Sequence, residues 1–129
     1  MERVALEDFL LIAEVVTKID AQVLAGAPHV VASAESALAA PFAEFGGDQF
    51  YDGLAMKAAV LCSRLLRNHP LPDGNKRVAY LCMIELIRRN GRAWRPVAGN
   101  AERTRMVNGL AAHTVAEDQF AAWLERQMA

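Results

Sequence analysis

Ten residues near the middle of the chain, 68–77, read Asn-His-Pro-Leu-Pro-Asp-Gly-Asn-Lys-Arg. Two prolines and a glycine do not fit inside one regular helix, because proline lacks a backbone N–H and glycine favours turns. The stretches on both sides repeat apolar residues at helical spacing. The run therefore predicts two helices joined by a loop that the prolines stiffen.

Helical spacing dominates the rest of the chain as well, and no stretch alternates clearly enough to predict a sheet. We expect N-caps at Asp52 and Asn100, a C-cap at Gly91, and a capping box of Thr114 and Glu117 before the last helix. The predicted helices cover residues 6–24, 32–40, about 52–68, 76–90, 101–112 and a last segment with Phe120, Trp123 and Leu124. This pattern predicts one all-α domain over residues 1–129 with about six helices.

The chain has 129 residues, of which 53% are apolar, so it can bury a core without disulfides or a structural metal. No apolar run approaches the roughly 18 residues that a membrane span needs. The N-terminal residues lack the basic start and apolar core of a signal peptide, so we expect a cytoplasmic protein with no membrane partner. Cys62 and Cys82 lie in apolar helical patterns and are expected to be reduced core thiols.

The net charge of −1 is unevenly distributed. Residues 1–52 carry 2 basic and 9 acidic side chains, whereas residues 53–129 carry 12 basic and 6 acidic ones. The basic half contains the loop, and ten of its cations fall between residues 64 and 105: Arg64, Arg67, Lys76, Arg77, Arg88, Arg89, Arg92, Arg95, Arg103 and Arg105. This pattern favours an anionic ligand or an acidic partner. For any single arginine outside the loop, a solvated helix face is the simpler interpretation.

The side chains of the loop form a set suited to phosphate chemistry. The imidazole of His69 can accept a proton from a hydroxyl group near neutral pH. The carboxylate of Asp73 offers oxygen to Mg²⁺, which binds through one or two carboxylates together with substrate phosphates. Gly74 allows a tight turn, and the next helix begins with free N–H groups beside Lys76 and Arg77. The loop thus predicts a site for a phosphorylated ligand.

The run from His69 to Arg77 resembles the signature of the Fic/Doc family, which reads His, Pro or another residue, Phe, any residue, Asp or Glu, Gly or Ala, Asn, Gly or Lys, and Arg. One position differs, because Leu71 stands where the family has Phe. Segments before the loop are also similar to Doc-type chains, namely Ser36–Pro41, Phe45–Gly47 and Lys57–Ala59. We expect the resemblance to cover nearly the whole chain.

Lys76 indicates which branch of the family the chain resembles. AMP-transferring members usually carry Gly at this position and often a second Arg where this chain has Tyr80. Members with Lys are similar to the Doc (death-on-curing) toxins, which transfer the γ-phosphate of ATP to a protein. The resemblance implies an ATP- and Mg²⁺-dependent protein Ser/Thr kinase, the toxin of a toxin–antitoxin pair. Its expected target is a translation elongation factor of the Tu type, modified on a Thr hydroxyl so that protein synthesis stops.

The same resemblance implies roles for the loop residues. His69 would remove the proton from the target hydroxyl, and Asp73 would bind Mg²⁺. Pro70 and Leu71 would anchor the loop. The phosphate-binding residues would be Gly74, Asn75, Lys76 and Arg77, with a nest of backbone N–H groups from the first three.

Several residues of the loop also have structural interpretations. His69 follows a helix and can serve only the last carbonyl groups of that helix. Asp73 is a common N-cap or turn residue, and Asn75 can cap the helix. Pro70 and Pro72 are consistent with a plain connection between helices.

Residues 41–51 place Gly46 and Gly47 between aromatic residues. The resemblance implies a hairpin-like flap beside the loop, including Phe45, Gly46 and Gly47, that aligns a target backbone by strand addition. Periodicity alone favours an ordinary connection whose aromatic side chains cover the core.

Other functions stay open at this point. An AMP transferase is the nearest alternative. A catalytically silent module that binds an antitoxin peptide or helix in its groove is another, and His69→Ala separates the two classes if it abolishes toxicity but leaves antitoxin binding intact. Direct DNA binding is not expected, because the net charge is near zero and no recognition motif is present. In Doc-type systems the antitoxin makes the contact with operator DNA.

Overall fold

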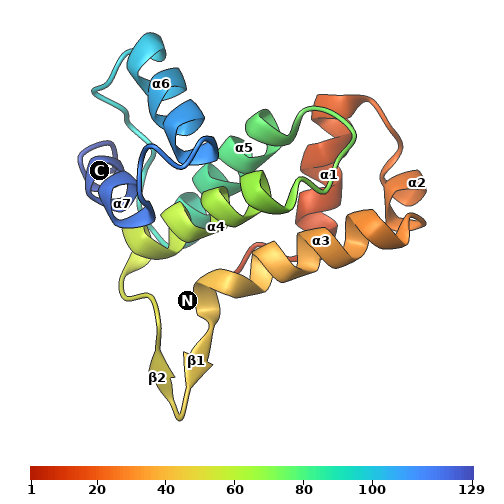
Figure 1. Cartoon of the computed structure of the whole chain (residues 1–129), viewed down its shortest axis with the longest axis horizontal. Coiled ribbons are helices and arrows are strands. Elements are labelled where there is room, and N and C mark those ends of the chain that lie inside the picture. The colour runs from red at the N-terminus through yellow and green to blue at the C-terminus, as the bar shows by residue number, and fades with distance from the viewer.

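The computed structural model describes residues 1–129 and is built almost entirely of helices (Figure 1). The elements in chain order are α1 Leu6–Thr17, α2 Ala21–Ala25, α3 Pro28–Ala39, the 3-10 turn η1 Ala40–Phe42, β1 Glu44–Phe45, β2 Asp48–Gln49, α4 Leu54–Asn68, α5 Asn75–Arg89, α6 Asn100–Ala111 and α7 Glu117–Glu125. The prediction of an all-α Fic/Doc-like fold is confirmed. None of the helices combines the length and the apolar character that crossing a membrane requires.

Helix α4 runs through the centre of the molecule and contacts α3, α5, α6 and α7 (Figure 1). Its buried side includes Leu61, Cys62 and Leu65, which join a single hydrophobic core. Both cysteines are free and buried, as predicted, and burial raises the pKa of the Cys62 thiol to about 12. The thiols therefore stay protonated and act as small apolar side chains.

The first predicted helix is in fact two helices, so the chain has seven α-helices rather than six. Lys18 adopts a left-handed conformation with φ 65° and ends α1. The Thr17 hydroxyl accepts the Ile19 N–H, and the Asp20 carboxylate then caps α2 by accepting the Gln22 N–H. Apolar spacing continues across this break, so periodicity alone did not reveal it.

The second predicted helix begins earlier than expected, at residue 28. Pro28 occupies the first turn of α3, where its missing N–H costs nothing because that group has no helical partner. The predicted end of the loop is close to the observed one, since α5 begins at Asn75. The C-terminal end of α5 also agrees with the prediction, because Gly91 follows the helix with φ +83°.

Three predicted caps are wrong. The residues at the N-cap positions of α4, α6 and α7 are Gly53, Gly99 and Ala116 rather than Asp52, Asn100 and Thr114. Gly53 has φ +81°, a conformation that favours glycine. At α7 the Gln119 side chain accepts the Ala116 N–H, while the Thr114 hydroxyl donates to the Gly109 carbonyl one turn back.

Residues 44–49 form a two-stranded antiparallel hairpin with Phe45 paired to Asp48. Gly46 and Gly47 both have positive φ, which suits the tight two-residue turn between such strands. Phe45 is 79% exposed and Phe50 63% exposed, so these aromatic side chains do not cover the core. The segment is therefore a hairpin rather than an ordinary connection, and of its aromatic residues Phe42 does pack against the core.

Candidate active site

His69 follows the last turn of α4 and has a left-handed backbone, with φ 50° and ψ 56°. Its N–H donates to the Leu65 carbonyl at 3.2 Å, so the backbone completes the helix end. The side chain is exposed and makes no hydrogen bond or ion pair within the protein. The imidazole itself is therefore not used to cap the helix. The left-handed conformation costs energy for a residue other than glycine, and residues in such conformations cluster at functional sites.

The loop is fixed from beneath by Leu71 and Asn75. Leu71 is only 2% exposed, and its N–H donates to Asn75 Oδ1 at 3.0 Å. Asn75 Nδ2 donates back to the Leu71 carbonyl at 2.8 Å, and Pro70 is buried beside them. The Asn75 side chain does not cap the helix, so that structural interpretation is wrong. It clasps the loop, and only its backbone N–H remains for a ligand.

The N-terminus of α5 is open. Gly74 occupies the N-cap position with φ +81°, and no side chain caps the helix, so Asp73 is not the predicted alternative N-cap. The first intrahelical bond runs from Val78 N–H to the Gly74 carbonyl, which leaves the N–H groups of residues 75–77 without a helical partner. Such a helix end attracts anions.

The loop and the start of α5 line a cleft of about 630 Å³, together with Leu66 of α4 and Ala111 of α6. We call it the loop cleft. The exposed polar side chains that line it belong to His69, Asp73, Lys76 and Arg77. None of the four has a hydrogen-bond or ion-pair partner in the protein. A base, a carboxylate and two cations are thus available to a ligand at an open helix end.

Five of the ten clustered cations have partners elsewhere in the fold: Arg64, Arg88, Arg89, Arg92 and Arg103. Arg89, for example, joins the carboxylates of Asp8 and Glu85. These arginines therefore have structural roles, although Arg64 and Arg89 are half-buried rather than solvated as the simpler interpretation expected. Lys76 and Arg77 differ because both are free and lie at the loop cleft.

No group of three or more His, Cys, Asp or Glu side chains in the structure can hold a metal ion. Asp73 provides one free carboxylate at the loop cleft. This donor set fits Mg²⁺, which completes its shell with water and phosphate oxygens. It does not fit a zinc site, which needs several N or S ligands.

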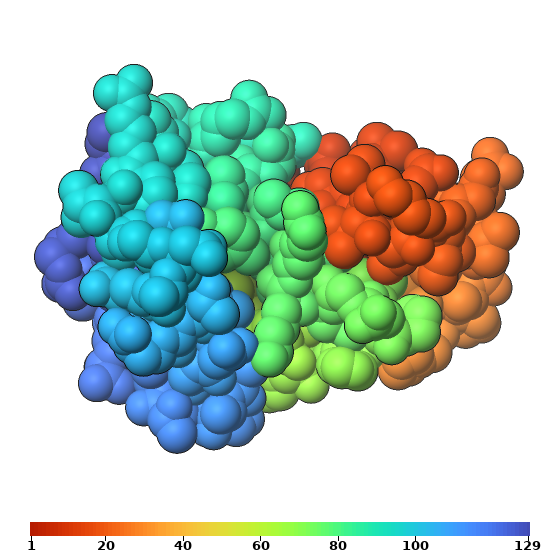
Figure 2. Space-filling view, turned by 90° about the horizontal axis from the view of Figure 1, so that it is seen from above, coloured from red at the N-terminus to blue at the C-terminus, as the bar shows by residue number.

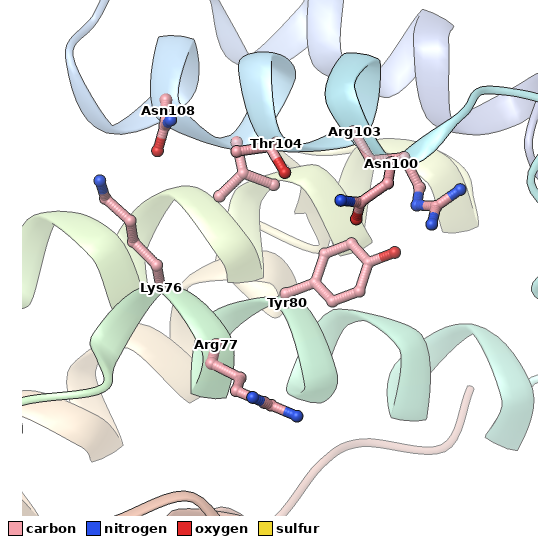
Figure 3. Close-up of a pocket in the computed structure, with 8 residues that line it drawn as sticks. Lys76, Arg77, Tyr80, Asn100, Arg103, Thr104 and Asn108 are labelled. Carbon is pink, nitrogen blue, oxygen red and sulfur yellow. The ribbon is translucent and has the colours of Figure 1, made fainter.

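A second cleft, of about 380 Å³, lies between α5 and α6 (Figure 3). We call it the α5–α6 cleft. Its polar lining was missed by sequence reasoning: Tyr80, Asn100, Arg103, Thr104 and Asn108. The spacing held a signal, because residues 100, 104 and 108 are four apart and share one helix face. Only the packing of α6 beside α5, visible in Figure 2, shows what that face meets.

The hairpin is not beside the loop as expected. It projects from the N-terminal end of α4, whereas His69 follows the C-terminal end of the same helix (Figure 1). A helix of 15 residues spans about 22 Å. The turn at Gly46 and Gly47 is therefore separated from His69 by the length of α4.

Comparison with protein-family models gives a match over residues 7–87 to the model described as the Fic/DOC family. The match includes the hairpin and the whole loop but ends within α5, so it is shorter than the nearly complete coverage we expected. Comparisons with curated proteins and with solved structures found no significant match. The matched segment is more than half of the chain. The chain therefore belongs to the Fic/DOC family, whose members transfer nucleotidyl or phosphoryl groups to proteins.

Proposed function

We propose that this protein transfers the γ-phosphoryl group of ATP to a Ser or Thr hydroxyl of a target protein and acts as the toxin of a toxin–antitoxin pair. The observation that carries the proposal is the loop cleft, where four reactive side chains without internal partners surround an open helix N-terminus. Phosphoryl transfer needs mainly positioning and charge stabilisation, which these groups supply.

In this mechanism His69 accepts the proton of the target hydroxyl as its oxygen attacks the γ-phosphorus. The bond from that phosphorus to the bridging β–γ oxygen breaks, and ADP leaves. The free N–H groups at the start of α5 and the guanidinium of Arg77 bind the phosphate oxygens. Lys76, one residue before Arg77 in the same turn, adds a second positive charge and would set how the triphosphate lies.

Asp73 would hold Mg²⁺ through its free carboxylate. The bound ion would neutralise charge on the phosphates of the donor. Asp73 would then orient the donor relative to His69, since both residues belong to the same loop. Asn75 contributes by holding that loop in shape.

The proposed target is a translation elongation factor of the Tu type in the cytoplasm. The exposed hairpin, including Phe45, supports docking of an extended target segment, because both outer edges of its two strands are unpaired. An extended segment of about seven residues would span the length of α4 toward His69. This arrangement accommodates the distance between the hairpin and the loop.

The proposed antitoxin would bind as an amphipathic helix in an apolar groove of about 280 Å³ between α1 and α5. The groove is lined by five apolar residues and one carboxylate: Leu11, Ile12, Val15, Leu81, Ile84 and Glu85. Leu11 is 58% exposed and Val15 67% exposed, which is unusual for side chains so close together on one helix.

The test uses ATP labelled on either the γ- or the α-phosphate, incubated with Mg²⁺, the protein and a bacterial lysate. We expect γ-label on one protein and no transfer by His69→Ala. Transfer of the α-label would instead establish the AMP-transferring alternative. If folded protein transfers neither label, the kinase proposal is wrong and a binding module remains.

A further inference from the structure

A pocket of about 250 Å³ lies where the C-terminal half of α4 meets the connection between α6 and α7. Helix α4 contacts both of these helices (Figure 1). Four polar residues line the pocket together with three apolar ones: Ser63, Arg67, His113 and Glu117 are the polar set. We call it the α7 pocket. It shares no lining residue with the loop cleft or the α5–α6 cleft.

Ser63 distinguishes this pocket from an ordinary hollow in the surface. The buried polar residues of the protein are Lys57, Ser63, Asn75 and Gln127. The side chains of the other three hydrogen-bond within the protein, whereas the Ser63 hydroxyl has no partner although the residue is only 4% exposed. It does not even bond to the carbonyl one turn back, as helical serines often do.

The Ser63 hydroxyl opens into the α7 pocket. Every polar side-chain atom that is fully sealed from solvent has a hydrogen-bond partner, so this unpartnered hydroxyl is not sealed. The pocket that Ser63 lines gives it access to solvent. A nearly buried donor without an acceptor is uncommon in a folded protein and indicates a place for a bound group.

Arg67 adds a cation next to this hydroxyl. It lies four residues after Ser63, so the two residues share one face of α4. Its guanidinium is exposed and makes no hydrogen bond or ion pair within the protein. A guanidinium binds the oxygens of a phosphate or carboxylate in pairs. The imidazole of His113, also exposed and without a partner, supplies a further donor to the same pocket.

The start of α7 contributes backbone donors. The N–H groups of Glu117 and Asp118 have no hydrogen-bond partner, and no side chain caps this helix end. The two carboxylates of this turn are already engaged, because Glu117 accepts from Arg64 at 3.1 Å and Asp118 accepts the Gln119 N–H at 2.9 Å. The free groups of the pocket are therefore donors.

We propose that the α7 pocket binds one small oxyanion, a phosphate group that is either free or carried by a side chain of a partner protein. The Ser63 hydroxyl and the Arg67 guanidinium donate to its oxygens, and the positive end of the α7 dipole stabilises its charge. The volume is below the range of about 300–1,000 Å³ that is usual for drug-sized ligands, so a single small group fits it. This inference does not depend on the proposed kinase activity.

The test follows backbone amide chemical shifts by NMR while inorganic phosphate or a short phosphoserine peptide is added at constant ionic strength. The amides of Glu117 and Asp118 report on the α7 pocket, and those of residues 75–77 report separately on the loop cleft. Wild-type protein should show a saturable shift at Glu117 and Asp118. Tighter binding of the peptide identifies a partner side chain as the source of the phosphate, whereas equal or tighter binding of inorganic phosphate identifies the free ion.

Ser63→Ala and Arg67→Gln should each weaken binding at the α7 pocket about tenfold, because each removes a donor to a charged group. Any binding at residues 75–77 should be unchanged. Arg105→Gln, exposed on α6 and outside the pocket, removes the same charge as Arg67→Gln and is the matched control. Arg67 is exposed, so its variant still tests the site if Ser63→Ala does not fold.

Three outcomes overturn the inference. If Glu117 and Asp118 show no saturable shift, the pocket holds only water. If both pocket variants bind as tightly as wild type, the anion binds the helix end without Ser63 and Arg67. If Arg105→Gln weakens binding as much as Arg67→Gln, the anion is attracted by the basic half of the chain in general. The kinase proposal is tested by transfer of label and stands or falls separately.

Discussion

The side chains of the loop between α4 and α5 divide into two groups. Leu71 and Asn75 are buried and bonded to each other, and they hold the loop. His69, Asp73 and Arg77 are exposed and unpartnered, and the loop presents them to the cleft. Because the two groups are separate, changes in the first should affect stability and changes in the second should affect chemistry.

Asn75→Ala should lower the free energy of unfolding by about 2–3 kcal/mol, because the buried N–H and carbonyl of Leu71 both lose their partner. The measurement is urea denaturation followed by circular dichroism. Asn108→Ala, at an exposed position without side-chain bonds, serves as the control and should stay within about 0.5 kcal/mol of wild type. Equal urea midpoints for the two variants would contradict the role of Asn75 in holding the loop.

Gly74→Ala should be more destabilising than Gly91→Ala. Both glycines have positive φ, near +80°, and alanine there costs about 1–2 kcal/mol. Only at Gly74 would the added Cβ also press on Val16, at 3.0 Å, whereas the space around Gly91 is open. Thermal unfolding of the two variants measures which one is less stable. A smaller loss of stability for Gly74→Ala than for Gly91→Ala would show that α1 does not pack on the loop in this way.

The hairpin is tied to α4 by two cations. Lys57, only 3% exposed, donates to the Gln49 side chain at 2.6 Å and to the Tyr51 carbonyl. Arg64 donates to the Tyr51 hydroxyl at 2.7 Å and pairs with Glu117 of α7. The base of the hairpin is therefore fixed while its tip at Phe45 is exposed, as a docking element requires.

Lys57→Met should loosen the hairpin without unfolding the protein, because methionine fills similar space but donates no hydrogen bond. Hydrogen exchange of residues 43–51 should become faster, including the Phe50 amide that bonds to the Ala43 carbonyl. The exposed Lys18→Met variant should exchange like wild type in this segment. Unchanged exchange in Lys57→Met would mean that the strand pairing alone holds the hairpin.

The sequence predicted most helices and the loop, because proline, glycine and apolar spacing act locally. It did not predict the break at Lys18, because a left-handed backbone conformation leaves no mark in the apolar spacing. It also missed the role of Asn75, because the side chain bonds to the backbone of Leu71 and not to another side chain. Strands of two residues are too short to alternate, so periodicity did not show the hairpin. The α5–α6 cleft depends on how two helices pack, which no single helix reveals.

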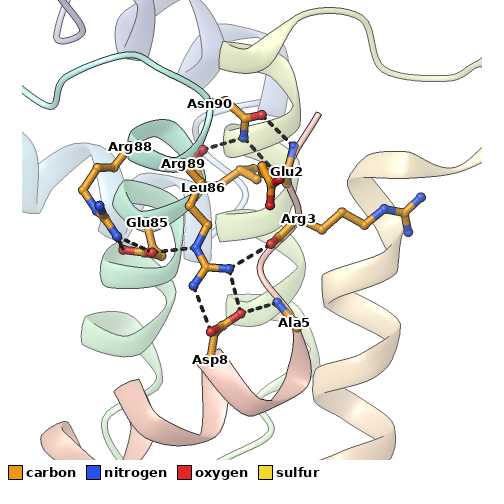
Figure 4. Close-up of polar contacts among 9 residues, drawn as sticks. All are labelled: Glu2, Arg3, Ala5, Asp8, Glu85, Leu86, Arg88, Arg89 and Asn90. Carbon is orange, nitrogen blue, oxygen red and sulfur yellow. Dashed lines mark hydrogen bonds and ion pairs between the residues drawn. The ribbon is translucent and has the colours of Figure 1, made fainter.

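A network of polar contacts joins the N-terminal region to the end of α5, which is far away in the sequence but packs beside α1 (Figure 4). Arg89 pairs with Asp8 at 2.8 Å and with Glu85 at 2.6 Å. The hydrogen bond from Arg89 holds the pKa of Asp8 below its usual value. Burial alone would raise the pKa of Glu85, but the hydrogen bonds from Arg88 and Arg89 outweigh it and lower that pKa.

Stability should therefore fall in acid. A carboxyl whose pKa is lower in the folded state stabilises the fold above its unfolded pKa, about 4, and this contribution is lost as pH falls through the folded pKa. Asp8→Asn should cost about 1 kcal/mol at pH 7 and less as the pH falls below about 4. Urea unfolding at several pH values measures this. Glu7→Gln, exposed in the same turn, is the control. The account is contradicted if the difference in unfolding free energy between Asp8→Asn and wild type does not become smaller in acid.

The central claim is that the loop cleft positions the γ-phosphate of ATP for attack by a target hydroxyl activated by His69. The most direct measurement is mass spectrometry of bacterial lysate proteins after incubation with this protein, Mg²⁺ and ATP, beside a His69→Ala control. We predict the mass of one phosphoryl group on a Ser or Thr of a translation factor, absent in the control. The mass of an adenylyl group would contradict the proposed orientation of ATP, and no added mass from folded protein that binds ATP would contradict catalysis.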